Sequence, residues 1–219
     1  MIFHESVPEV DRRRIEQALK DIKFYGDKFH QKIADFIKST EINIYLDVAE
    51  KVRGSGSVQL ENAWAARRAV KKRKLSVAEA AKFVRLNIVR ETINTGGQQG
   101  IEGTFVHEGK HTLDFALMLS TFSNGVAEKV FNPTAFQREY SAHLTSAFYL
   151  MRRGESYIKE GISLELLYKN GEKISVNRKG IRSRLKNNYG LTEETSGKRL
   201  NAISFPDIKF PRKKWFGIF

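Results

Sequence analysis

Residues 104–119, TFVHEGKHTLDFALML, are the stretch of this 219-residue chain that says most about its fold. Apolar side chains lie on both sides of the segment HEGKH, residues 107–111, and this pattern predicts a largely buried helix. On a helix, residues four apart lie on one face, with Cβ atoms about 5–6 Å apart. His107 and His111 can therefore reach one ion, while Glu108 is turned by about 100° to the side of it. Polar groups inside a core are costly unless something satisfies them, and a metal ion would do so.

The pattern H-E-x-x-H is typical of zinc metalloproteases, in which the two histidines bind Zn²⁺ and the glutamate is the general base. A catalytic zinc usually has three protein ligands and one water. Three residues are candidates for the third ligand. Glu139 lies on a second predicted helix, Asp114 shares the face of the two histidines, and His143 follows Glu139 by one helical turn. Because the chain has no cysteine, the ligands must be nitrogen and oxygen atoms.

At these residues the chain resembles the gluzincin, or thermolysin-like, type of zinc metallopeptidase. That family carries H-E-x-x-H on one helix and a glutamate ligand on a later helix. The resemblance implies that His107, His111 and Glu139 bind Zn²⁺ and that Glu108 activates water. It also implies a zincin-like fold, with a small sheet beside the active-site helix. We therefore prefer Glu139 over the two other candidates for the third ligand.

The resemblance covers roughly residues 104–146. The chain departs from the best-known members in having a longer gap between the two helices, and in having His143 where those members often carry an aspartate. His143 is then a candidate catalytic residue that donates a hydrogen bond to a developing oxyanion, or a support for Glu139; a histidine in a packing face is the alternative. Asp114 would hold a ligand imidazole in the tautomer that binds metal, and pairing with Lys110 is its alternative.

The hydrophobic periodicity predicts one α+β domain over residues 1–219, mostly helical. Residues 1–40 could form a helical N-terminal extension, and residues 191–219 a basic, aromatic C-terminal tail. The capping pattern Ser76-x-x-Glu79 predicts a helix start, and Asn170-Gly171 predicts a hairpin turn. The expected elements, in chain order, are a helix at 9–38, a strand at 42–48, a turn or mobile loop at 54–57, a strand leading into a helix at 58–74, a helix at 76–92, a flexible connection near the site or a plain linker at 96–100, the H-E-x-x-H helix, a helix at 133–153, a hairpin at 164–176 and a basic helix at 178–189.

The formal net charge is +13, and it is concentrated. Residues 178–214 carry eleven Lys and Arg against three acidic residues, and residues 67–74 form a second basic block. Such segments could bind nucleic acid, an anionic membrane or an acidic partner, although solvated helix faces are the commoner explanation. No apolar run has the length of a membrane span, and the N-terminus has no signal-peptide pattern. These features suggest a cytoplasmic protein, or one secreted or injected without a classical signal peptide.

The sequence thus favours a zinc-dependent metallopeptidase that hydrolyses peptide bonds in a peptide or protein substrate. A compact module of this kind resembles the effector domains of bacterial toxin systems, which would imply an immunity or inhibitor protein as a partner. The alternative is a non-catalytic, basic module that binds nucleic acid or another partner and has a structural or degenerate metal site. Nucleic acid is the less favoured partner.

Overall fold

The computed structural model describes residues 1–48, 54–125, 130–154 and 165–205. Within these residues the chain is α+β and mostly helical, as predicted. The elements, in chain order, are β1 (Ile2–Phe3), α1 (Glu9–Tyr25), α2 (Lys28–Ser39), β2 (Asn43–Asp47), β3 (Gly56–Leu60), α3 (Ala63–Lys72), α4 (Val77–Ala81), β4 (Val84–Val89), α5 (Arg90–Ser123), α6 (Ala135–Arg153), β5 (Leu167–Asn170), β6 (Lys173–Val176), α8 (Arg178–Tyr189) and α9 (Leu200–Ser204).

The main sheet has four strands in the order β1-β2-β4-β3. The first three strands are parallel to one another, and β3 closes one edge antiparallel to β4. The apolar side chains of β4 are fully buried at Val84, Leu86 and Ile88. β4 is therefore the central strand of the core, and β3 is the edge strand beside it.

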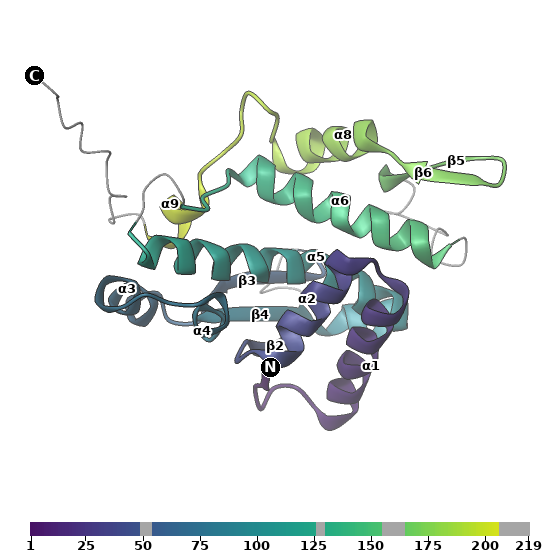
Figure 1. Ribbon diagram of the computed structural model, residues 1–219. Coiled ribbons are helices and arrows are strands. Elements are labelled where there is room, and N and C mark those ends of the chain that lie inside the picture. The colour runs from purple at the N-terminus through teal and green to yellow at the C-terminus, as the bar shows by residue number, and fades with distance from the viewer. Residues whose placement is uncertain (49–53, 126–129, 155–164, 206–219) are drawn as a thin grey trace, which may run out of the picture.

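The helix that carries residues 107–111, α5, packs between the sheet and α6 (Figure 1). Helices α1 and α2 also pack against α5, and the β5–β6 hairpin and α8 lie on the outer side of α6 (Figure 1). Most of α5 is buried, including Phe105, Val106, Phe115 and Leu119. This position explains why both flanks of the H-E-x-x-H segment are apolar.

The N-terminal residues 1–39 belong to the same core. β1 pairs with β2, and Ile15, Ile22, Ile33 and Ile37 from α1 and α2 are fully buried in the cluster that contains Phe105. The helix expected at 9–38 is divided in two, because Asp27 caps a new helix: its carboxylate accepts hydrogen bonds from the backbone N–H groups of Phe29 and His30.

Three predictions for the chain between residues 54 and 100 differ from the structure. The capping box at Ser76 does start a helix, but α4 ends at Ala81 and the chain then forms β4. The expected flexible connection at 96–100 is part of α5, whose path kinks at Gly97, where φ is +56°. The expected turn at 54–57 is shorter, because β3 already begins at Gly56.

The later predictions agree better with the structure. The hairpin and the basic helix are present as β5–β6 and α8, with Gly190 in the left-handed conformation after α8. The tail expected at 191–219 contains the short helix α9, and its residues 206–219 lie outside the described residues. Among the residues that the structure describes, no helix combines the length and the apolar character that crossing a membrane would require.

Candidate metal centre

Local sequence signals place the two helices of the site. α6 begins with a capping box, in which Thr134 accepts from the backbone N–H of Gln137 and the Gln137 side chain accepts from the backbone N–H of Thr134. Glu139 follows within the next turn, and His143 lies one turn beyond it. On α5, His107 and His111 are likewise one turn apart. Each helix therefore presents a pair of polar side chains at i, i+4 spacing to the other helix.

The structure brings His107, His111 and Glu139 together. The Nε2 atom of His107 lies 3.5 Å from Oε2 of Glu139, and Nε2 of His111 lies 3.4 Å from Oε1 of the same carboxylate. The His107 and His111 rings are 4.9 Å apart between centroids. His111 is buried, whereas His107 and Glu139 have side chains 17% and 16% exposed. The cluster is therefore reached from solvent on the side of His107 and Glu139.

These separations suit ligands of one ion better than direct hydrogen bonds. Hydrogen bonds from nitrogen to oxygen usually measure about 2.7–3.2 Å. Ligand atoms about 2.0–2.2 Å from a tetrahedral zinc ion lie about 3.3–3.6 Å from one another. The two distances of 3.4 and 3.5 Å fall in the second range, although they end on different oxygens of Glu139. Among the described residues, the side chains whose ligand atoms all lie within 4.8 Å of one another are His107, Glu139 and His143. Two imidazoles and one carboxylate are also a ligand set that catalytic zinc commonly has.

The electrostatics of the cluster favour a positive charge between these side chains. Burial opposes ionisation of Glu139, but the two imidazoles outweigh it, and the pKa of Glu139 is lowered well below its usual range. Burial would lower the pKa of His111, yet the Glu139 carboxylate reverses this effect and the pKa is raised overall. The carboxylate therefore stays ionised beside the two imidazoles.

Some buried polar atoms near the cluster have no hydrogen-bond partner among the described residues. They include Nδ1 of His111, Oδ2 of Asp114 and both ring nitrogens of His143. Within the described part of the chain, Asp114 forms no hydrogen bond with His111, contrary to one prediction. Its Oδ1 atom instead accepts from Nζ of Lys110 at 2.5 Å, which was the alternative. Burial raises the pKa of Asp114, and the ammonium of Lys110 opposes that rise.

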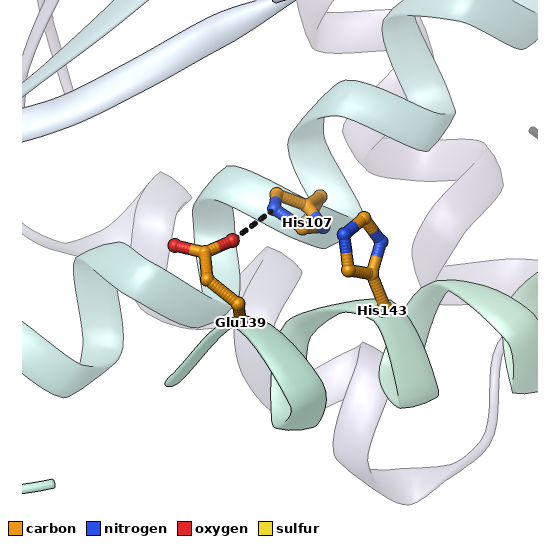
Figure 2. Close-up of side chains that lie close together, drawn as sticks. All are labelled: His107, Glu139 and His143. Carbon is orange, nitrogen blue, oxygen red and sulfur yellow. Dashed lines mark ion pairs between the residues drawn. The ribbon is translucent and has the colours of Figure 1, made fainter. Parts of the chain in front are cut away.

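His143 lies at the same cluster, as the sequence suggested. Its side chain is almost fully buried, and its ring centroid is 4.6 Å from that of His107. Figure 2 shows His107 between the Glu139 carboxylate and the His143 ring, with Glu139 and His143 on successive turns of α6. Burial, together with the neighbouring His107, lowers the pKa of His143 to about 3. His143 is therefore neutral at physiological pH.

Glu108 lies beside the edge strand of the sheet. It is buried, and its Cγ atom would be 3.0 Å from a Cβ placed on Gly56, the first residue of β3. Its charge acts on His111, where it favours the protonated form. Glu108 thus packs against β3, and its charge acts on His111 and on Tyr189.

A buried polar network joins α5 to α6 on the far side of the histidines. Glu102, which is fully buried, accepts a hydrogen bond from the Tyr149 hydroxyl and forms an ion pair at 3.2 Å with Arg153. Because Glu102 comes from α5 and the two partners from α6, the network fixes the positions of the two helices relative to one another. It thereby holds the ligand pairs of the two helices in register.

Two residues of the site carry no signal in the sequence. Tyr189, the last residue of α8, has its ring 6.0 Å from that of His143, and burial and the charge of Glu139 raise its pKa. Gly56 seemed to belong to a turn. Both residues are far from the motif in sequence, and only the packing of α8 on α6 and of β3 on β4 brings them to it.

Comparison with known proteins adds no relative: no protein-family model, no curated protein and no solved structure matches the chain.

Proposed function

We propose that the protein is a zinc-dependent metallopeptidase that hydrolyses peptide bonds. The observation that carries the proposal is that His107 and His111 lie 3.5 and 3.4 Å from the two oxygens of one carboxylate, Glu139, on the neighbouring helix. The fold supports it too, because the helix with the H-E-x-x-H segment lies against a small sheet, as in the family that the sequence resembles. The exposure of His107 and Glu139 gives a substrate access to the cluster.

A zinc ion at this cluster would supply a Lewis acid for the substrate carbonyl and would acidify a water. The chain's own residues perform the proton transfers. Glu108, next to His107, takes a proton from the attacking water and delivers it to the leaving amine. His143 stands beside the cluster, where it can donate a hydrogen bond to the carbonyl oxygen as negative charge develops on it.

The substitution Glu108→Gln tests this mechanism. It removes the general base but none of the proposed ligands, so zinc content should stay at the wild-type value while peptide hydrolysis falls by about 10²–10⁴-fold. His111→Ala should instead lose the metal. Zinc content measured on purified protein, with cleavage of casein, separates the two effects. Glu91→Gln, at an exposed position near the start of α5, is the matched control and should change neither property.

Full activity in the Glu108→Gln protein would refute the proposed mechanism. A wild-type protein that binds no zinc would refute the function as a whole.

A basic surface on α3 supports a second candidate function, binding of nucleic acid. Trp64 is 66% exposed, and the guanidinium of Arg68 lies 5.3 Å from its ring centroid. Lys71 and Lys72 are exposed at the end of the same helix. Cations beside an exposed aromatic ring are typical of surfaces that bind single-stranded nucleic acid. Salt-dependent retention on nucleic acid, with no proteolysis in the presence of zinc, would favour this function over the first.

A further inference from the structure

The environment of His143 is unusual for a histidine in a packing face. Its side chain is almost fully buried, and neither ring nitrogen has a hydrogen-bond partner among the described residues. A neutral imidazole has one N–H donor and one acceptor nitrogen, so both are left unsatisfied. A buried polar group in this state destabilises the folded protein. A metal ion would satisfy one of these nitrogens, because it accepts the lone pair of that nitrogen.

The position of His143 supports a metal ion in this role. One ligating atom each from His107, Glu139 and His143 lie within 4.8 Å of one another. Figure 2 shows the three side chains pointing into the same space between α5 and α6. His111 adjoins this triplet through Glu139, because its Nε2 atom lies 3.4 Å from Oε1 of that carboxylate. A tetrahedral zinc site has four ligand positions, and these four side chains could each supply one atom.

We infer that His143 is a fourth protein ligand of the ion, so that His107, His111, Glu139 and His143 enclose it in the resting protein. The inference rests on the proposed zinc site and adds to it. Hydrolysis needs an open coordination position, and His143 is the ligand that gives up its place to water or to the substrate. The other two imidazoles each contact the Glu139 carboxylate, whereas the His143 ring has no such contact to hold it.

X-ray absorption spectroscopy of the zinc-loaded protein tests this coordination, because imidazole ligands give a characteristic scattering pattern that can be counted. The wild-type protein should show three imidazoles, and His143→Ala should show two, with an added light oxygen ligand. The zinc dissociation constant of His143→Ala should rise by at least about 10–100-fold. Loss of a residue that merely hydrogen-bonds a metal ligand already has an effect of this size, and loss of a ligand should have no smaller one. His4→Gln is the control. It removes a histidine that stacks on Tyr45 and does not belong to the cluster, so the number of imidazole ligands should remain three.

Two imidazoles on zinc in the wild-type protein would overturn the role of His143 and leave the proposed metallopeptidase intact. Absence of bound zinc would overturn both. The wild-type spectrum decides between these outcomes by itself, so the test does not depend on the folding of His143→Ala. Three imidazoles in both proteins would also overturn the inference, because the third would then come from another residue.

Discussion

Gly56 determines where the side chain of Glu108 can lie. A Cβ on Gly56 would be 2.9 Å from the carbonyl oxygen of Asn87, 3.0 Å from Cγ of Glu108 and 3.1 Å from Cγ2 of Thr104. The first atom belongs to the backbone of β4 and cannot move without distorting the sheet. The edge strand can therefore approach α5 this closely only with glycine at its first position.

We expect Gly56→Ala to displace Glu108 and so to reduce the rate of hydrolysis without loss of zinc. A misplacement of about 1 Å in a reacting group can cost about 10²-fold in rate. The measurement is kcat on a peptide, alongside the zinc content of the same preparation. Gly103→Ala is the control, because no atom lies within 4 Å of a Cβ at Gly103. Wild-type kcat in Gly56→Ala would show that this contact does not position the base.

Helix α2 crosses α5 at the centre of the H-E-x-x-H segment. A Cβ on Gly109 would be 2.6 Å from Cγ2 of Ile33 and 2.9 Å from Cδ1 of Ile37, and both isoleucines are fully buried. Gly109 occupies the first variable position of the H-E-x-x-H motif, and close packing against α2 requires glycine there. It lets α2 cover the face of α5 that is turned away from α6.

We expect Gly109→Ala to destabilise the protein by about 1–3 kcal/mol, because a methyl group overfills the contact with α2. Gly103→Ala, on the same helix but in open space, should stabilise the fold by up to about 1 kcal/mol, since alanine favours helix more than glycine does. Urea unfolding of the two variants gives the comparison. Equal free energies of unfolding for the two variants would mean that α2 shifts to accommodate the added methyl group.

The elements that the sequence predicted are those with local signals. The two histidines at i, i+4 spacing and their apolar flanks predicted a helix, which is part of α5. Asn170-Gly171 predicted the β5–β6 hairpin, and Gly190 predicted the end of α8. β4 also has such a signal, because its apolar residues alternate with Arg85 and Asn87. It was missed because the helix that starts at the Ser76 capping box was expected to run to residue 92, whereas α4 ends at Ala81.

Local signals also predicted part of the site. Spacing alone placed His107 and His111, and the face of the second helix, together with the family resemblance, placed Glu139 beside them. Gly56 and Tyr189 could not be found in this way. Their positions depend on how β3 and α8 pack, which is determined by contacts between distant parts of the chain rather than by neighbours in sequence.

At the scale of the whole molecule, the metal cluster and the basic surface of α3 are separate features. The exposed cations of α3 lie at the opposite end of the molecule from α8, while the cluster is between α5 and α6 (Figure 1). Substitution of Lys71 and Lys72 would change long-range attraction to anionic partners, but would leave the ligands in place.

Zinc should stabilise the whole fold, because its ligands converge only when α5 and α6 are packed together. At about 100 times the dissociation constant, an ion that binds only the folded state adds about 2.7 kcal/mol to the free energy of unfolding. The rise in Tm on adding zinc measures this effect. His111→Ala should show little or no rise, and an equal rise in that variant would place the ion elsewhere.

The size of this effect should depend on pH, with a sign set by the histidines. Protons compete with zinc for imidazole nitrogens, so the rise in Tm should shrink as pH falls. Because the pKa of His111 is raised above its ordinary value of 6.5, the loss should begin above pH 6.5. Glu139, whose pKa is lowered, stays ionised throughout this range and does not contribute to the loss. Calorimetric scans with and without zinc from pH 8 to pH 5 test the trend, and an effect of zinc that is constant over this range would exclude imidazole ligands.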